Sequence, residues 1–199
     1  MKLTDALEEK FNDQITLEFE ASLVYRQLAI EMEIRDLPGI AAWLRHQADE
    51  EIVHANKWID HLSDRDNHPK IGASAAPKVD VKTVLDVFNV ALEHERRVSD
   101  SIRDLYRAAN DDIDSKSLIQ WFVNEQVEEE ATVSEIVGRL KLIDGDGPGL
   151  LRLDEELGQR PVASTEYSRT LVSRNVPAQG SAGPRAKPVP TIRNGMRPT

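Results

Sequence analysis

Apolar residues recur along most of the chain with the alternating three- and four-residue spacing of amphipathic helices. This spacing predicts four long helices, at about residues 4–35, 38–65, 83–110 and 115–144, because Gly and Pro are nearly absent inside these ranges and occur between them. A short fifth helix is predicted at about 148–157, between glycines. The pattern therefore predicts an all-α protein.

The lengths of the connections predict how these helices are arranged. The first and third connections are short, so each joins two antiparallel neighbours. The connection 67–82 is rich in Pro, Gly, Ala and Ser and can extend to roughly 50 Å. A helix of about 30 residues is roughly 45 Å long, so this connection can cross the whole bundle. We expect a four-helix bundle with one long crossover.

A carboxylate interrupts the apolar stripe of every long helix near its middle. These positions are Glu18, Glu51, Glu95, and on the fourth helix Glu125 and Glu129. Burying unpaired carboxylates is costly, and neighbouring like charges add to the cost. Lys and Arg are absent from these central positions, so ion pairs cannot offset the cost of burying all these carboxylates. A multivalent cation can offset the cost, and the stripes therefore predict a metal site inside the bundle.

One imidazole accompanies these carboxylates. His54 lies three residues after Glu51 and shares its helix face. Carboxylates with nitrogen suit Fe²⁺, Mn²⁺ or Zn²⁺, and open positions on iron would admit O₂. We expect Glu51 to bridge two metal ions. Tyr25, on the stripe of Glu18, is placed to hydrogen-bond a ligand or donate an electron, and a plain core tyrosine is an equally good interpretation.

Composition narrows the class of protein further. The chain has no cysteine, which excludes disulfides, thiolate zinc sites and cysteine-ligated iron–sulfur centres. Its charged N-terminus does not resemble a secretory signal, and no uncharged run approaches the length of a membrane span. We expect a cytoplasmic protein without a membrane partner. The net charge of −10 disfavours nucleic acid as the main ligand and suits attraction of cations.

The motifs at these positions resemble those of the non-haem bacterial ferritins, a ferritin-like diiron family. The likeness covers about residues 5–158 and includes, in chain order, LEFEASLVY, ADEEIVHA, LEHERRV, IQWFVNEQVEEE and DGPGLLRLDEEL. It implies a ferritin-like bundle with a diiron ferroxidase centre. The first iron would be held by Glu18, Glu51 and His54. The second would be held by the bridging Glu51 with Glu95 and Glu129, and Gln126 would lie alongside.

The resemblance also implies a third metal site and a closed shell. The third site would use Glu50, Glu125 and Glu128 and share Glu129. Family members form hollow shells of 24 subunits around a ferric mineral, with the short fifth helix at the four-fold axes. Haem is not expected, because Ile52 replaces the methionine that ligates haem in bacterioferritins, and residues 126–129 lack their second Glu-x-x-His.

We therefore expect an iron-storage protein that oxidises Fe²⁺ with O₂ or peroxide and stores the product as ferric mineral. Two alternatives stay open: a diiron or dimanganese oxidase that stores nothing, and a catalytically silent helical bundle that acts in interactions. Asp111, Asp112 and Asp114 are candidates for a pore that admits iron, although acids are also favoured at a helix N-terminus by the helix dipole.

Residues 160–199 differ from the rest of the chain. They carry seven Lys or Arg against one Glu, are rich in Ser, Pro and Gly, and show no periodicity. We expect two parts: a ferritin-like diiron bundle at 1–159 and a basic, disordered tail at 160–199. The resemblance does not cover the tail. It could be inert, bind nucleic acid through its cations, or dock the protein to a larger compartment.

Overall fold

A computed structural model describes residues 1–159 of the chain; the expected tail lies outside the described residues. The described part contains five α-helices and no strand. Their bounds are α1 Asp5–Glu33, α2 Pro38–Asp64, α3 Val84–Ala108, α4 Ile113–Ile143 and α5 Gly147–Gly158. Each bound lies within about two residues of its prediction, so the all-α assignment is confirmed. None of these helices is long and apolar enough to cross a membrane.

Local sequence explains where the long helices begin. Thr4 accepts a hydrogen bond from the Leu7 backbone and caps α1. At α3, Thr83 and Asp86 form a reciprocal capping box, with hydrogen bonds of 3.1 and 2.8 Å. Asp112 caps α4 through the backbone N–H of Ser115.

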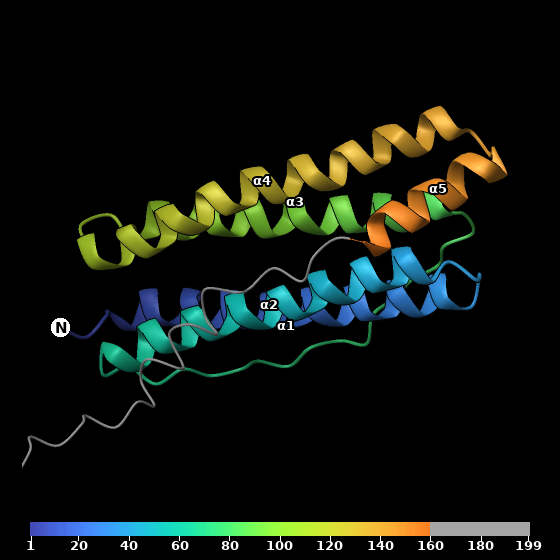
Figure 1. Ribbon diagram of the computed structural model, residues 1–199. Helices are drawn as coiled ribbons and strands as arrows, with labels where there is room; N and C mark the ends of the chain where they lie inside the picture. The colour runs from blue at the N-terminus through green and yellow to red at the C-terminus, as the bar shows by residue number, and fades with distance from the viewer. Residues whose placement is uncertain (160–199) are drawn as a thin grey trace, which may run out of the picture. The chain divides into compact units, whose positions relative to one another are not determined.

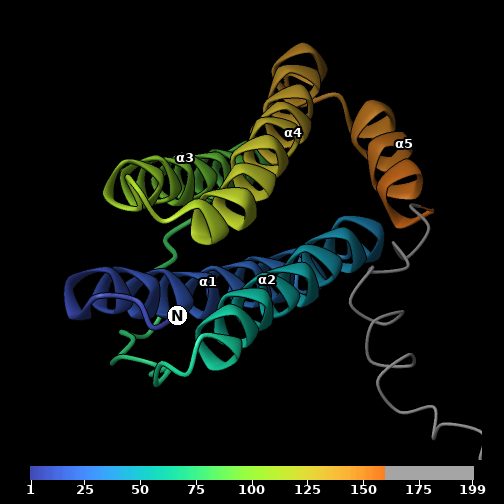
Figure 2. The same ribbon diagram turned by 90° about the vertical axis from the view of Figure 1, so that its left-hand side faces the viewer.

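The four long helices form two antiparallel pairs, α1 with α2 and α3 with α4, which lie one above the other in two layers (Figures 1 and 2). The connection 67–82 runs along the outside of the first pair (Figure 1). Side chains in and just after α1 hold it there: Thr16 accepts from the Gly72 backbone at 2.8 Å, and Arg35, which follows the end of α1, donates to the Val81 carbonyl at 2.8 Å. The connection therefore passes from the first half of α1 to beyond its C-terminal end, which confirms the long crossover.

Helix α5 packs against the beginning of α2. Leu37, at the N-cap of α2, offers no side-chain hydrogen bond, and Asp154 of α5 supplies one by accepting from the Ile40 backbone at 2.7 Å. Two glycines allow this close approach. A Cβ on Gly39 would lie 1.9 Å from the Asp154 carbonyl oxygen, and one on Gly158 would lie 2.8 Å from the Gly39 Cα.

The apolar core of the described bundle is divided into two clusters. One includes Met32, Trp43 and Phe88, and the other includes Phe11, Trp58, Ile102 and Phe122. Along all four long helices, the predicted acidic positions fall between residues of these two clusters. The bundle thus has a polar layer with an apolar core on either side of it.

The apolar stripe of the fourth helix, predicted to run through Leu118, Phe122, Glu125, Glu129 and Thr132, is wrong in part. On α4 the buried positions include Ile119, Gln126 and Val133, whereas Leu118, Glu125 and Thr132 are only half-buried. The reason is that the buried face of α4 follows the other possible heptad phase. Its steps of three and four residues run through Ile119, Phe122, Gln126, Glu129 and Val133. Glu129 belongs to both phases and is buried.

Candidate metal centre

The polar layer brings together three potential metal ligands from two helices. Glu18 of α1 and Glu51 and His54 of α2 are all buried, and one ligand atom from each lies within 4.8 Å of the others. Among residues 1–159 this is the only such group of three or more His, Cys, Asp or Glu side chains. The antiparallel pairing of α1 and α2 places Glu18 opposite Glu51, and the i, i+3 spacing adds His54.

Glu95 of α3 enters the same layer from the opposite pair of helices. It is fully buried and accepts a hydrogen bond at each oxygen: from the Tyr25 hydroxyl at Oε1 and from Gln126 at Oε2, 3.1 Å away. Ser99 also lies within reach of the Gln126 amide, at 3.4 Å. Tyr25 therefore makes the hydrogen bond to a candidate ligand that its position suggested, whereas an electron-transfer role stays a prediction.

Glu129 of α4 completes the set of central carboxylates. Its Oε2 accepts a hydrogen bond of 3.0 Å from Gln47 of α2, which joins the two layers of the bundle across the site. Burial, and then the charges of Glu95, Glu18 and Glu129, raise the pKa of Glu51, so these carboxylates lie near enough to interact. All four long helices thus contribute to one acidic layer.

The burial of so many acids changes their ionisation. Loss of water contact raises the pKa of Glu18 to about 7, although hydrogen bonds from Gln14 and Trp58 act in the opposite direction. Burial also raises the pKa of Glu51 well above its usual range, with a further contribution from the charges of Glu95 and Glu18. Burial raises the pKa of Glu95 as well. Without a cation, these buried carboxyl groups keep their protons at pH values where exposed carboxyl groups would be ionised.

The pKa of His54 is shifted in the direction that favours metal binding. Burial, with the nearby positive charge of Lys57, lowers its pKa to about 3, so the imidazole is neutral at physiological pH. A neutral imidazole has a lone pair on one ring nitrogen and can bind a metal ion. Its Nδ1 lies 3.3 Å from Glu51 Oε2, and aromatic rings of Trp121 and Phe122 contact the imidazole edge-on.

One buried oxygen shows directly that the described residues leave the site unsatisfied. When the neighbouring acids are ionised, Glu18 Oε2 has no hydrogen-bond donor, although it is inaccessible to water; in the metal-free protein a protonated Glu51 would donate to the Glu18 carboxylate. Buried carboxylate oxygens normally accept hydrogen bonds or bind cations. An unpartnered oxygen beside a second carboxylate and a neutral imidazole is the donor set of an Fe²⁺, Mn²⁺ or Zn²⁺ site, so the residues present fit a metal ion.

The residues expected at a third metal site are less closely assembled. Glu50 and Glu125 are half-buried, and Glu128 is exposed. Glu50 lies near enough to Glu95 to raise its pKa. These side chains do not form a compact ligand group among residues 1–159. The third site therefore stays a prediction.

The three aspartates considered as pore residues have different environments. Asp112 forms a two-pronged ion pair with Arg65, at 2.6 and 2.8 Å, in addition to capping α4. This pairing lowers its pKa below the usual range. Its contacts are those of a helix N-terminus tied to the end of α2. Asp111 and Asp114 are exposed.

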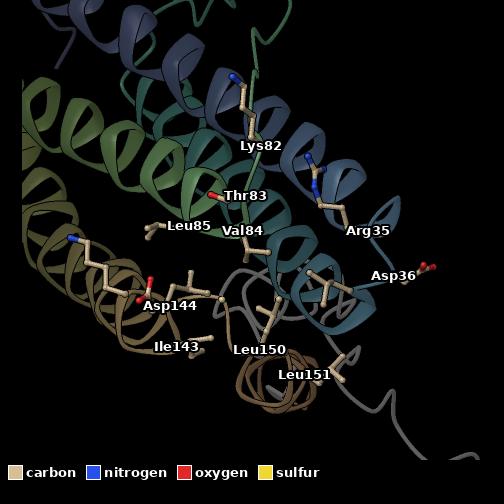
Figure 3. A pocket seen from close by; sticks show the side chains of 15 residues that line it. Arg35, Asp36, Lys82, Thr83, Val84, Leu85, Ile143, Asp144, Leu150 and Leu151 are labelled. Carbon is tan, nitrogen blue, oxygen red and sulfur yellow. The ribbon is translucent and has the colours of Figure 1, made fainter.

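A surface pocket lies at another place, where the α1–α2 connection, the start of α3, the end of α4 and α5 meet (Figure 3). It has a volume of about 830 Å³ and a mainly apolar lining that includes Val84, Ile143 and Leu150. Its two acids, Asp36 and Asp144, lie at opposite sides of the pocket and both have positive φ angles, typical of turn residues. The pocket offers no converging ligands, so the polar layer is the better candidate for the functional site.

Three donors around the carboxylates were not predicted from the sequence. Gln14 and Trp58 each donate to Glu18 Oε1 at 2.8 Å, and Gln47 donates to Glu129. Gln47 lies one helical turn before Glu51, and Gln14 one helical turn before Glu18. A buried amide beside a buried acid is the signal that could have identified both. The Trp58 indole had no such signal, because a tryptophan on an apolar stripe is ordinary core.

Comparison with known proteins supports the same interpretation. The model of the ferritin-like domain family matches residues 8–143. A bacterial non-heme ferritin from Escherichia coli O6:H1 is 34% identical over 151 residues, which is 75% of this chain and 92% of that protein. One from Staphylococcus aureus strain MRSA252 is 33% identical over 160 residues, or 79% and 96% of the two chains.

Solved structures are similar as well. The open-pore ferritin of the hyperthermophilic archaeon Archaeoglobus fulgidus superposes with a TM-score of 0.78 at 34% identity, covering 80% of this chain and all of that one. A form of the same archaeal ferritin engineered to be closed gives the same TM-score and identity, with 80% and 99% coverage.

Proposed function

Because this chain belongs to the ferritin-like family, we propose that it oxidises Fe²⁺ at the polar layer and stores the product as ferric mineral within an oligomeric shell. The observation that carries this proposal is the cluster of Glu18, Glu51 and His54, with its unpartnered carboxylate oxygen, at the centre of a four-helix bundle. Fe²⁺ is the substrate of the reaction, and O₂ or peroxide is the oxidant.

The arrangement of carboxylates supports two neighbouring iron positions. Glu51 lies in one ligand group with Glu18 and His54, and the charges of Glu95 and Glu129 also act on it. We assign the first iron to Glu18, Glu51 and His54, and the second to Glu51, Glu95 and Glu129. Glu51 is then the shared ligand, which couples the two irons so that each can give up one electron to the same oxidant.

The surrounding residues prepare the layer for this chemistry. Gln126 and Tyr25 hold the two oxygens of Glu95, and Gln47 holds one oxygen of Glu129, so the carboxylates keep their orientation. The apolar clusters on either side exclude water from the layer. Iron binding displaces protons from the acids whose pKa burial has raised, and the site then carries carboxylates paired with metal charge.

Storage requires more than one chain, since one bundle has no cavity of the size of a mineral core. The ferritin shells of the family consist of 24 subunits, and a shell of 24 chains of 22.4 kDa would have a mass of roughly 540 kDa. We propose a homo-oligomer of this kind in the cytoplasm. A third iron near Glu50, Glu125 and Glu128 would be an additional position on the way to the cavity.

Stopped-flow oxidation of Fe²⁺ by the purified apoprotein, combined with measurement of particle mass, tests this proposal. We expect rapid oxidation up to about two irons per chain, then slower mineral growth in a particle near the mass of 24 chains. Glu51→Gln should abolish the rapid phase, and Glu135→Gln is its matched control. Glu135 is an exposed glutamate on α4 outside the layer, so its exchange should leave oxidation unchanged.

Two results would contradict parts of the proposal. Rapid oxidation by a particle of one or two chains would indicate an oxidase that stores no mineral. Oxidation no faster than in buffer alone would remove the ferroxidase assignment and leave a helical bundle with buried acids.

A further inference from the structure

Trp58 donates a hydrogen bond to a candidate iron ligand from inside the core. It lies on α2 one helical turn after His54, is fully buried, and its indole Nε1 lies 2.8 Å from Glu18 Oε1. Indole N–H is a donor only, so this contact fixes which group gives the proton. The hydrogen bond joins α2 to α1 at the edge of the polar layer.

A second donor occupies the same oxygen. Gln14 Nε2 lies 2.8 Å from Glu18 Oε1, and the Ser101 hydroxyl of α3 donates to Gln14 Oε1 at 2.6 Å. Because Gln14 Oε1 accepts from Ser101, its amide nitrogen must face Glu18. Glu18 Oε1 thus receives two N–H groups, one from α1 and one from α2.

The Trp58 ring cannot easily turn away from this position. It stacks on Phe122 of α4 with a centroid distance of 3.7 Å and an interplanar angle of 17°, and it meets Phe11 of α1 edge-on at 5.5 Å. The ring is held between two other helices in a close-packed core, so the direction of its N–H is set by packing. The donor is therefore already oriented before any ligand binds.

The two oxygens of Glu18 are consequently unequal. Oε1 has two N–H donors, whereas Oε2 is buried without one, and one oxygen of Glu18 lies within 4.8 Å of the ligand atoms of Glu51 and His54. We propose that Trp58 is a positioning residue of the first iron site. Its N–H donates a hydrogen bond to Glu18 Oε1 and so leaves Oε2 as the single oxygen through which Glu18 binds iron. This inference rests on the proposed ferroxidase function.

The consequence is a more open coordination sphere. A carboxylate that binds through both oxygens occupies two positions on the metal, whereas one that binds through a single oxygen occupies one. With one oxygen each from Glu18 and Glu51 and one nitrogen from His54, three positions of a six-coordinate Fe²⁺ would be filled by the protein. Coordination positions on the iron stay available for the oxidant, because Trp58 prevents Glu18 from occupying one of them with its second oxygen.

Anaerobic titration with Co²⁺, a visible-absorbing probe of coordination number, tests the inference without oxidation. In Trp58→Phe the ring remains but the donor is lost, so the second Glu18 oxygen can reach the metal. We expect Co²⁺ to bind still, with the intensity of its visible bands changed by roughly half because a second Glu18 oxygen enters the coordination sphere. In parallel, the maximal rate of Fe²⁺ oxidation should fall about tenfold, with half-saturation changed by less than about twofold.

Two further variants separate positioning from packing. Gln14→Leu removes the other donor to the same oxygen and should change the Co²⁺ bands in the same direction, which also decides the question if Trp58→Phe does not fold. Trp43→Phe makes the same exchange on α2 in the other apolar cluster, where the ring contacts Tyr25 and Phe88, and should leave the bands unchanged.

Each result points in one direction. Unchanged bands in both Trp58→Phe and Gln14→Leu, or an equal effect of Trp43→Phe, would overturn the inference while the proposed function stands. Failure of the unaltered protein to bind Co²⁺ at all would overturn the proposed function together with it.

Discussion

At the scale of single residues, the polar layer opposes folding in the absence of metal. Glu18, Glu51 and Glu95 are buried beside one another, and burial raises the pKa of each. No lysine or arginine forms an ion pair with these three carboxylates within residues 1–159. Such an arrangement is typical of a site where stability has been exchanged for function.

Glu51→Gln should separate function from stability. The exchange keeps the size of the side chain and removes the carboxylate that faces all the others, so the apoprotein should gain roughly 1–2 kcal/mol in free energy of unfolding. The oxidation rate should fall about 100-fold or more, because the shared ligand is lost. Thermal unfolding and stopped-flow oxidation measure the two effects. A destabilised variant that oxidises iron normally would contradict the assignment of Glu51.

The stability of the apoprotein should fall as the pH rises above 6.5. The pKa of Glu18 is about 7 in the folded protein and 4.5 in the unfolded chain, so the folded state holds a proton that raising the pH removes at a cost. His54 acts in the opposite sense, chiefly below its unfolded pKa of 6.5, since its folded pKa is about 3. The Glu18 contribution is lost between pH 4.5 and about 7.5, and Glu51, whose pKa burial raises well above its usual range, adds a loss of the same sign. From pH 6.5 to 8.5 we expect a loss of roughly 1 kcal/mol, or about 3 °C in Tm.

Glu18→Gln provides the control for this pH dependence. The variant lacks the titrating group, so its Tm should vary less over the same range. An unaltered protein whose Tm is flat between pH 6.5 and 8.5 would show that the carboxylates are hydrated in solution and the layer is not closed to water.

The sequence predicted the buried acids of this layer better than the groups that orient them. Acids at the centre of apolar stripes are conspicuous, because nothing else on those faces is charged. The roles of Gln14, Gln47 and Trp58 depend on distances between helices, which periodicity does not contain. The assigned roles of the metal ligands themselves stay predictions until a metal is observed.

At the scale of helices, the bundle depends on how its ends are joined. Helix boundaries were predictable because Thr4, Thr83 and Asp112 are capping residues and because Gly and Pro mark the connections. The phase of α4 was not, since two heptad phases share Phe122 and Glu129 and only packing against α3 selects one of them. The docking of α5 on α2 was also invisible, because it depends on Gly39 and Asp154, which are far apart in the chain.

Gly39→Ala should detach or distort α5. Its Cβ would meet the backbone of Asp154 at 1.9 Å, so α5 must move and α2 would lose its cap at Ile40. We expect a loss of about 2 kcal/mol or more in stability, and faster cleavage by trypsin at Arg152 of α5. Limited proteolysis and thermal unfolding measure these changes.

Gly138→Ala is the matched substitution for this test. Gly138 is an exposed position within α4, and a Cβ there would meet nothing within 4 Å. Alanine should therefore stabilise α4 by roughly 0.5–1 kcal/mol. Equal effects of the two substitutions would contradict the role given to the contact between α5 and α2.

At the scale of the whole molecule, charge is distributed unevenly along the chain. Residues 1–159 contain 34 Asp or Glu against 18 Lys or Arg, whereas residues 160–199 contain one against seven. An acidic body attracts cations such as Fe²⁺ and repels nucleic acid. All the candidate ligands and all five described helices lie in the acidic part.

A chain ending at Gln159 should therefore oxidise iron and assemble like the full chain. We expect rates within about twofold and a particle mass reduced only by the removed residues, measured by stopped-flow absorbance and light scattering. Loss of assembly in the shortened chain would show that residues 160–199 belong to the structural part of the protein, and the boundary predicted at 159 would be wrong.

The most direct test of the account is the anomalous diffraction of crystals loaded with Fe²⁺ without oxygen. The account predicts two iron peaks per chain inside the bundle, one beside Glu18, Glu51 and His54 and one beside Glu51, Glu95 and Glu129, both absent from Glu51→Gln crystals. Iron peaks only on the surface, with the buried carboxylates still protonated and unliganded, would contradict it.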